Sequence, residues 1–446
     1  MKRQYFGTDG VRGEFGGPVI NETFAARLGE AAGRWLHRDG AIAAPPLVLI
    51  GRDTRGSGPL LERALARGLA AAGVRVGTLG VVPTPAVSLA VREHKAALGV
   101  VVTASHNPAA DNGIKFFGPS GTKLDDADEL LIESLLPETP ATADAAPAEF
   151  AAEASYVHRL SERLRPGLLR GWTIVVDAGN GAAHRTTPAV LRALGAEVDV
   201  IGGSPDGSNI NAGCGSQHPQ AMCRRVVETG ARLGIAHDGD ADRLIVSDEK
   251  GVEVDGDEVL AILAGEALRQ GRLQHHTLVA TVQSNLGLKR FMEQQRGRLV
   301  QTAVGDRYVI AAMLEGGFNL GGENSGHIIC TDVSPCGDGL AAALLLIEAM
   351  IATGRPLSLL RTCLKKFPQA TRALRVTRKP EVATLALLTS AIGAAEARLG
   401  ADGRVLVRYS GTEPKIRLLV EGPEEALVAD LIASLERAVE QEGLRA

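Results

Sequence analysis

Three stretches of this 446-residue chain repeat one plan, and that plan limits the folds that the chain can adopt. Each stretch has an apolar strand, a small or polar turn, an amphipathic helix and a second strand, and the three span residues 47–76, 174–200 and 278–300. Strands that alternate with helices over short connections predict α/β layers with mainly parallel strands. A glycine suited to a helix C-cap stands before each second strand: Gly73, Gly195 and Gly297.

The chain is too long for one hydrophobic core, and its pattern changes near the end. After residue 366 the sequence predicts a strand, a helix, two strands and a final helix, which together indicate a smaller α+β domain. The expected fold class is therefore α/β, with three related α/β domains of mixed, mainly parallel sheets plus a C-terminal α+β domain. We expect the domains to span residues 1–153, 154–254, 255–367 and 368–446, with an exposed Ala/Pro/acid connection at 137–147.

Composition excludes several classes of protein. The net charge of −4 and the aromatic content of 3% argue against a nucleic-acid-binding surface. The five cysteines are an odd number without a C-x-x-C pair, which indicates reduced thiols in a cytosolic protein. No signal peptide is expected, and the apolar run 340–351 contains Glu348 and is too short to span a bilayer, so it predicts a core helix. We therefore expect a cytoplasmic protein with no nucleic-acid and no membrane partner.

A serine follows a buried strand in a setting that favours ligand binding. Residues 98–103 are apolar and mostly β-branched, which predicts a buried strand, and Ser105, His106 and Asn107 follow it. Pro108 restricts Asn107 to an extended conformation, so no helix can begin there. Ser105 is therefore expected on a tight loop at the carboxyl end of a strand, where open α/β sheets bind their ligands. A turn serine without function is the alternative.

Three aspartates alternate between two apolar strands. Asp238, Asp240 and Asp242 supply hard oxygen ligands of the kind that Mg²⁺ prefers. An EF-hand calcium loop is rejected, because Arg243 stands at the sixth position, where that loop needs glycine. A phosphatase loop of the D-x-D-x-T/V type is rejected too, since its fifth position is Asp242. A solvated acidic turn remains the alternative, which the flanking strands and the neighbouring arginine disfavour.

Three further loops contain glycine with polar or charged side chains. Residues 6–13 form a glycine turn with Arg12, and residues 321–327 offer the carboxylate, amide, hydroxyl and imidazole groups that suit a hydroxyl-rich ligand such as a sugar. Residues 408–414 join two predicted strands, and their small residues can form an anion nest beside Arg408. Each loop alone is a weak signal, because most glycine turns are only turns.

Lys115 lies among apolar residues soon after the serine loop. A partly buried lysine at this place could be tuned for proton transfer. The alternative is a strand lysine that faces solvent.

Several nucleotide-binding and hydrolase motifs are missing from the sequence. It has no G-x-x-x-x-G-K-S/T loop, no G-x-S-x-G elbow and no complete G-x-G-x-x-G. A nucleotide-driven kinase, an esterase and a dehydrogenase are therefore disfavoured.

Taken together, these loops resemble those of the α-D-phosphohexomutase family. The resemblance covers essentially the whole chain, and its five motifs occur in the family's order at residues 6–13, 103–108, 238–243, 321–327 and 410–414. Five loops in order are far more specific than any one of them. The resemblance implies four domains around a central cleft, which agrees with the division predicted from the strand and helix pattern.

The resemblance also implies a role for each motif. Ser105 would be phosphorylated and would donate and accept the phosphoryl group, and the three aspartates would hold Mg²⁺ together with an oxygen of the serine phosphate. The sugar would be bound by Glu323, Asn324 and Ser325, and its non-reacting phosphate by Arg408, Ser410, Gly411, Thr412 and Arg417. The reacting centre would be lined by Arg12, Lys115 and Arg243, with Lys115 as the candidate acid/base and His106 and His327 as further candidates for proton handling.

The reaction implied is the interconversion of glucosamine 6-phosphate and glucosamine 1-phosphate through a sugar 1,6-bisphosphate, feeding UDP-N-acetylglucosamine and cell-wall synthesis. The opening loop and the chain length favour this branch of the family. Asn324 departs from it, because the glucosamine branch usually has Gln there and the phosphomannomutase/phosphoglucomutase branch often has Met. That second branch is the alternative, and a non-catalytic sugar-phosphate sensor is a remote one. The oligomeric state stays open, with a homodimer as the candidate.

Overall fold

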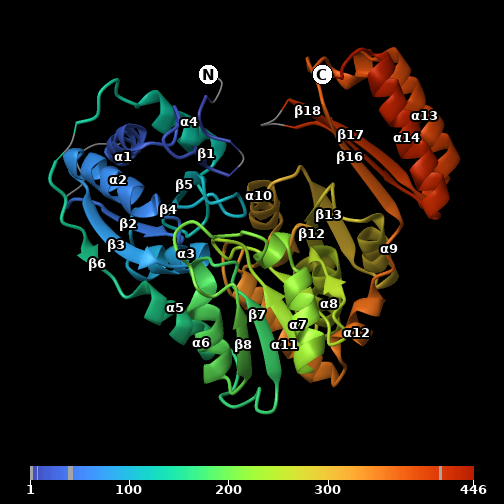
Figure 1. Cartoon of the computed structure of the whole chain (residues 1–446), viewed down its shortest axis with the longest axis horizontal. Coiled ribbons are helices and arrows are strands. Elements are labelled where there is room, and N and C mark those ends of the chain that lie inside the picture. Colours follow the sequence, from blue (N-terminus) through green and yellow to red (C-terminus); the bar gives the residue numbers. More distant parts are fainter. Residues whose placement is uncertain (1–3, 8, 39–43, 142, 411–413, 446) are drawn as a thin grey trace. The chain divides into compact units, whose positions relative to one another are not determined.

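The structure is a computed structural model that describes residues 4–7, 9–38, 44–141, 143–410 and 414–445 (Figure 1). The chain forms two compact units. The first unit contains Met1–Val282 and Val300–Cys363, and the second contains Gln283–Leu299 and Leu364–Ala446. This partition does not test the predicted boundaries of the four domains, which stay a prediction.

The first unit opens with a six-stranded sheet in the order β1-β5-β4-β2-β3-β6. Strands β2, β3, β4 and β6 run parallel, whereas β5 is antiparallel to both β4 and β1. The strands are β1 (Val11–Glu14), β2 (Leu47–Arg52), β3 (Arg75–Val81), β4 (Leu98–Val102), β5 (Asp111–Phe117) and β6 (Ala148–Glu149). The helices of this part are α1 (Glu22–Leu36), α2 (Gly58–Ala71), α3 (Thr84–Glu93) and α4 (Asp126–Ser134).

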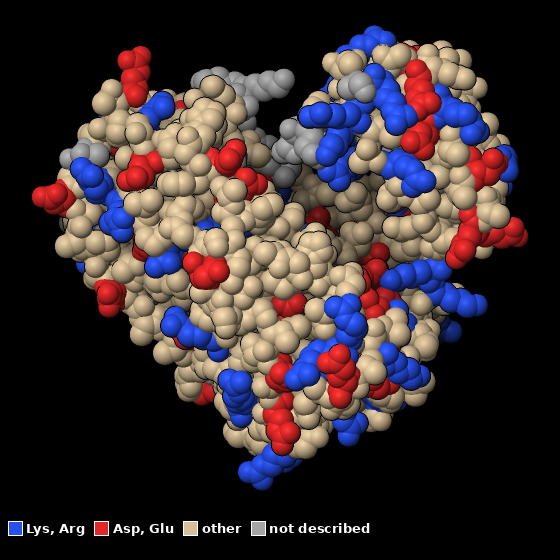
Figure 2. Space-filling model, viewed as in Figure 1, with Lys and Arg blue, Asp and Glu red and all other residues tan. Residues whose placement is uncertain are grey.

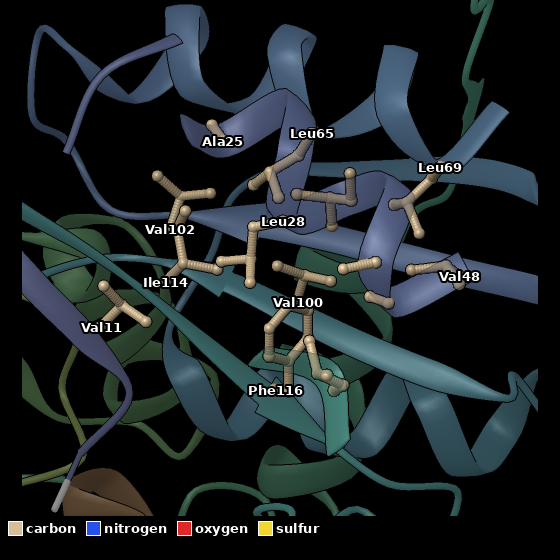
Figure 3. Close-up of a cluster of buried hydrophobic side chains, with 14 of the residues drawn as sticks. Val11, Ala25, Leu28, Val48, Leu65, Leu69, Val100, Val102, Ile114 and Phe116 are labelled. Carbon is tan, nitrogen blue, oxygen red and sulfur yellow. The ribbon is translucent and has the colours of Figure 1, made fainter. Parts of the chain in front are cut away.

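The core of this part lies between the sheet and the helices α1 and α2 (Figure 3). Alternate residues of each strand point into it, as the period of two along a strand requires. The strands contribute Val48, Val100, Val102, Ile114 and Phe116, and the helices contribute Ala25, Leu28, Leu65 and Leu69. This packing fixes the carboxyl end of β4, from which the serine loop leaves the sheet.

The second sheet has five strands in the order β11-β10-β9-β7-β8. Its centre is parallel, and β10 is antiparallel to both of its neighbours. The strands are β7 (Thr173–Asp177), β8 (Glu197–Ile201), β9 (Leu233–Ala236), β10 (Ile245–Ser247) and β11 (Glu253–Val254). The accompanying helices are α5 (Ala152–Ser161), α6 (Thr186–Ala193) and α7 (Gln220–Thr229).

The third sheet has four strands in the order β13-β12-β14-β15, with β12 parallel to β14 and β14 antiparallel to β15. The strands are β12 (Thr277–Thr281), β13 (Arg298–Thr302), β14 (Leu320–Gly322) and β15 (Ile328–Cys330). The helices of this part of the chain are α8 (Gly256–Arg269), α10 (Asp306–Gly316), α11 (Gly339–Thr353) and α12 (Leu357–Leu360). The α/β layers expected from the repeated plan are confirmed, with antiparallel strands at one edge of each of the three sheets.

The second unit contains an antiparallel sheet in the order β16-β18-β17. Its elements are α9 (Leu286–Gln294), β16 (Gln369–Arg375), α13 (Ala386–Leu399), β17 (Arg404–Tyr409), β18 (Lys415–Glu421) and α14 (Glu425–Gln441). Its apolar core includes Leu388, Ile416, Leu418 and Leu435, which lie on α13, β18 and α14. The α+β pattern predicted after residue 366 is confirmed.

Helix α11 is the core helix expected from the apolar run at 340–351, and most of its side chains are buried. In the described part of the chain, no single helix is long and apolar enough to cross a bilayer. The bent pair formed by Gly339–Thr353 and Leu357–Cys363 passes that test only when both helices are taken together.

Candidate active site

Ser105 lies on the tight loop that follows β4, as predicted. Its backbone has a positive φ of 51°, which is uncommon for a residue with a side chain, and only 1% of the residue is exposed. The hydroxyl donates a hydrogen bond of 2.5 Å to Asp238 Oδ2. The structure therefore brings the predicted serine and the first predicted aspartate into direct contact.

His106 lies beside the same hydroxyl, with its Nδ1 3.3 Å from Ser105 Oγ. Burial, together with the nearby cations Arg243 and Arg12, lowers the pKa of His106 to about 3. The imidazole is therefore neutral at pH 7.

The three predicted aspartates form one buried cluster in the loop between β9 and β10. Each of Asp238, Asp240 and Asp242 offers a carboxylate oxygen, and these oxygens lie within 4.8 Å of one another. The loop can approach the serine closely because residue 239 is glycine: a Cβ there would lie 2.7 Å from the carbonyl oxygen of Ser105.

The donor set fits a metal ion. The Oδ1 atoms of Asp240 and Asp242 are buried and have no hydrogen-bond partner among the described residues. Burial, together with the charges of Asp242 and Asp240, raises the pKa of Asp238 to about 8. A bound cation would relieve this repulsion, and carboxylate and hydroxyl oxygens are ligands for hard cations.

Lys115 on β5 is buried against the same cluster, with only 1% of the residue exposed. Its Nζ lies 2.9 Å from Asp240 Oδ2, 3.1 Å from Asp9 Oδ2 and 3.5 Å from Asp242 Oδ2. Burial by itself lowers the pKa of Lys115, but the three carboxylates hold it above its ordinary value, so the ammonium group keeps its proton. The alternative of a solvent-facing strand lysine is therefore wrong.

A second ionic network, which the sequence analysis missed, adjoins the first. Lys123 Nζ pairs with both Asp9 and Asp306, and Asp306 Oδ2 lies 3.3 Å from His327 Nε2. His327 Nε2 is also 3.7 Å from Asp242 Oδ2. No local pattern indicated this network, because Lys123 lies 114 positions from Asp9 and 183 positions from Asp306 in the chain.

Arg12 and Arg243 both reach this centre. Arg12 pairs with Asp9 and donates from Nη1 to Asn107 Oδ1 at 3.3 Å. Arg243 Nε lies 3.9 Å from Asp238 Oδ2, and its backbone bridges to His327, which joins the aspartate loop to the loop at 323–327. The Nε atoms of both arginines are buried without a hydrogen-bond partner in the described ranges.

The predicted sugar loop connects β14 to β15. Glu323 Oε1 accepts a hydrogen bond of 3.0 Å from the Gly305 amide, and the Asn324 carbonyl accepts one of 3.2 Å from the Gly256 amide. The buried Ser325 Oγ has no hydrogen-bond partner within the described residues. The loop therefore offers an unused hydroxyl and a partly exposed carboxylate and amide to a polar ligand.

The predicted phosphate-binding residues belong to the second unit. Arg408 on β17 stands opposite Arg417 on β18, and the Ser410 carbonyl accepts a hydrogen bond of 2.7 Å from Lys379 Nζ. Both arginines line a hollow of about 160 Å³ together with Gln283 and Thr371. Basic side chains gather over the strands of this unit (Figure 2). Gly411 and Thr412 lie outside the described residues.

Four family models match this chain in order. They are described as domains of phosphoglucomutase/phosphomannomutase: alpha/beta/alpha domain I at residues 3–142, domain II at 154–251, domain III at 255–367 and the C-terminal domain at 373–438.

Individual relatives match over almost the full length. The phosphoglucosamine mutase of Cereibacter sphaeroides is 47% identical, over 98% of this chain and 99% of its own length. That of Caulobacter vibrioides is also 47% identical, over 98% and 99%. A crystal structure of a putative phosphomannomutase from Thermus thermophilus superposes with a TM-score of 0.82 at 28% identity and covers 98% of both chains.

Proposed function

This chain belongs to the phosphoglucomutase/phosphomannomutase family, and on that basis we propose that it interconverts glucosamine 6-phosphate and glucosamine 1-phosphate. The two relatives named phosphoglucosamine mutase, each 47% identical to this chain, support this substrate. The single observation behind the proposed chemistry is the hydrogen bond of 2.5 Å between Ser105 Oγ and Asp238 Oδ2, inside a cluster of carboxylates and cations.

In the proposed reaction, Ser105 alternates between a free and a phosphorylated hydroxyl. A hydroxyl of the sugar phosphate attacks the phosphorus of phosphoserine, so that a new P–O bond forms to the sugar and the P–Oγ bond breaks. The product is a sugar 1,6-bisphosphate. Transfer of its other phosphate back to Ser105 Oγ then completes the isomerisation and restores phosphoserine. Such transfers depend mainly on positioning and on neutralising charge.

Asp238, Asp240 and Asp242, with an oxygen from Ser105 or its phosphate, would hold one Mg²⁺ ion. When bound, Mg²⁺ draws negative charge away from the transferred phosphoryl group. The unpartnered Oδ1 atoms of Asp240 and Asp242 support this assignment.

The remaining residues of the centre would bind charge and move protons. Arg12 and Arg243 would bind phosphate oxygens, for which their unpartnered Nε atoms are available. Lys115 would be a candidate acid/base, and because its carboxylate neighbours keep it protonated it would also supply positive charge to the centre. The neutral His106 can take the proton of the attacking hydroxyl, and His327 is a second candidate for that step.

Two sets of residues would bind the rest of the substrate. Glu323, Asn324 and Ser325 would bind the sugar, and the non-reacting phosphate would be bound by Arg408, Ser410, Gly411, Thr412 and Arg417. The two ends of the bisphosphate must exchange places between the two transfers, so the phosphate site must accept either end. We further propose a cytoplasmic enzyme, with a homodimer as the assembly to test, whose product feeds UDP-N-acetylglucosamine and peptidoglycan synthesis.

A ³¹P NMR assay with Mg²⁺ and a trace of sugar 1,6-bisphosphate tests the substrate. Glucosamine 6-phosphate and glucose 6-phosphate are supplied in parallel, and we expect faster conversion of the amino sugar. Faster conversion of glucose 6-phosphate would move the assignment to phosphoglucomutase/phosphomannomutase activity, which Asn324 leaves as the second candidate. The Ser105→Ala variant should bind the sugar phosphate and lose essentially all turnover; turnover near the wild-type rate would contradict the phosphoserine chemistry.

A further inference from the structure

The turn that follows β2, residues 53–55, has no part in the proposed reaction, although it contains a fully buried cation. The Arg55 side chain has no exposed surface, and it forms an ion pair with the equally buried Asp53 two residues before it. A buried arginine is stable only when its charge and its donors are satisfied.

All five N–H donors of the Arg55 guanidinium are engaged. One of them, Nε–H, bonds Asp53 Oδ2 at 2.9 Å. The other four bond backbone carbonyls of the loop around Ser105: Nη2 reaches Ser105 at 3.1 Å and Asn107 at 2.8 Å, and Nη1 reaches Asp111 at 2.8 Å and also Pro108. The planar fork of this side chain thus holds four carbonyl oxygens of one loop.

Asp53 binds the amide group of Ser105 indirectly, through the hydroxyl of Thr103. The amide of Ser105 donates to Thr103 Oγ1 at 2.9 Å, and Thr103 Oγ1 donates to Asp53 Oδ2 at 2.6 Å. Asp53 Oδ1 accepts from the Arg55 amide at 3.0 Å. Both polar groups of the Ser105 backbone are therefore bound, directly or through Thr103, by the Asp53–Arg55 pair.

This arrangement maintains a backbone conformation that serine does not favour. Ser105 has a φ of 51°, where its Cβ crowds the backbone. A φ in this region persists only when the surroundings enforce it. The direction of the Cα–Cβ bond, and with it the position of Oγ next to Asp238, depends on that φ.

We propose that Arg55 and Asp53 are positioning residues for phosphoryl transfer. They hold Ser105 in its left-handed conformation, so that Oγ keeps its place beside the aspartate cluster whether or not it carries a phosphoryl group. Arg55 and Asp53 act through the backbone of the loop and touch neither sugar nor phosphate. This inference rests on the proposed function, because it assigns the pair a role in the turnover of Ser105.

The test compares Arg55→Lys and Asp53→Asn with the wild type and with Arg52→Lys. Arg52 lies on β2 three residues before Arg55, and its Nε pairs with Glu62 Oε2 on α2 at 2.9 Å. Its Nη1 donates at 3.5 Å to the Asp53 carbonyl and not to the loop around Ser105, so it serves as a matched arginine that does not bind that loop. Each full-length protein is phosphorylated with glucose 1,6-bisphosphate, and the phosphoserine is counted by intact mass. Steady-state kcat per phosphorylated site and KM for glucosamine 6-phosphate are then measured below the thermal midpoint of every variant.

Lysine keeps the charge at position 55 but cannot present a planar fork to four carbonyls. We expect Arg55→Lys and Asp53→Asn to lower kcat roughly 100-fold, the effect of misplacing a reacting group by about 1 Å, while KM changes by less than about threefold. Arg52→Lys should keep kcat within about twofold of the wild type. If Arg55 and Asp53 had only a structural role, their variants would contain less folded protein. The kcat per phosphorylated site would then not fall while KM stays nearly unchanged.

The inference is overturned if Arg55→Lys turns over at the wild-type kcat, or if Arg52→Lys loses as much. If the proposed function is wrong, the result is different. The wild type itself then forms phosphoserine but does not convert glucosamine 6-phosphate. In that case the same variants are compared on glucose 6-phosphate, and a wild-type kcat for Arg55→Lys there would again overturn the positioning role.

Discussion

Ser105 Oγ and Asp238 Oδ2 are joined by a hydrogen bond of 2.5 Å, although the two residues lie 133 positions apart in the chain. The bond connects the loop after β4 with the loop after β9, so two different sheets contribute to one centre. Each loop leaves the carboxyl end of a central strand, where the sheets of α/β proteins place their ligands.

The first prediction concerns this carboxylate. Asp238→Asn removes one charged oxygen from the cluster while it keeps the size of the side chain. We expect kcat to fall by about 100-fold or more, equal to about 3 kcal/mol, since the charge that balances a metal ion beside the transferred group is reduced. Asp199→Asn on β8, which removes a partly exposed carboxylate paired with Arg225, is the control and should leave kcat unchanged. Equal activity of the two variants would contradict the role of the cluster.

The second prediction concerns Gly256 at the start of α8. A Cβ at this position would collide with the carbonyl oxygen of Glu323 and the amide nitrogen of Gly326, both in the backbone of the sugar loop. Gly256→Ala should therefore displace that loop and raise KM for the sugar phosphate by about tenfold or more. The phosphorylation of Ser105 by a bisphosphate should persist. Gly393→Ala is the control, because a Cβ there has nothing within 4 Å; an unchanged KM in Gly256→Ala would argue against sugar binding by this loop.

The third prediction concerns the stability of the first unit. Arg307 on α10 forms two hydrogen bonds of 2.9 and 3.0 Å with the buried carboxylate of Glu129 on α4. Arg307→Met removes the arginine that pairs with this buried carboxylate, which should cost about 3 kcal/mol or more of unfolding free energy. Arg269→Met breaks an exposed pair with Glu266 and should cost less than about 1 kcal/mol. Urea unfolding of both variants measures the two losses of unfolding free energy. Equal losses would show that the buried pair stabilises the protein no more than the exposed pair does.

The fourth prediction concerns pH. Burial raises the pKa of Asp338, which caps α11 and accepts a hydrogen bond from Tyr156, to about 6 from its ordinary value of 3.8. Because its pKa is raised on folding, the folded state binds this proton more tightly than the unfolded state does. The stabilisation of the folded state by the protonated Asp338 carboxyl group is therefore complete below about pH 4 and is lost as the pH rises through about 6.

Asp338→Asn removes this titration. A shift of about two pKa units corresponds to about 3 kcal/mol. The unfolding free energy of the wild type, taken relative to that of the variant, should therefore fall by most of this amount, about 2 kcal/mol, between pH 4 and pH 7. A difference that stays constant over this range would show that the carboxyl group does not titrate as described.

Local pattern predicted much of the site. A strand followed by small polar residues and proline placed Ser105 correctly on its loop, and the alternation of aspartates with small residues placed three carboxylates in one cluster. These features depend on neighbours in the sequence, so one sequence suffices to find them. The repeated strand–turn–helix plan predicted the α/β layers for the same reason.

The sequence could not predict contacts between distant segments. Asp9, Lys123 and Asp306 come from three separate segments and meet in one network, which no local period indicates. Arg55 lies in the small or polar turn of the first repeated stretch, and nothing local indicates its role, because its four carbonyl partners lie more than 49 residues along the chain. Lys115 could face either side of its strand until the fold fixed the register of β5 against β4.

The central claim is that Ser105 carries the phosphoryl group during turnover, and a chase experiment tests it most directly. The enzyme is phosphorylated with ³²P-labelled glucose 1,6-bisphosphate, the label is located by peptide mapping, and unlabelled glucosamine 6-phosphate is then added. The account predicts label on Ser105 alone, and its transfer to the amino sugar at a rate no slower than kcat. Label on another residue, or transfer slower than turnover, would contradict it.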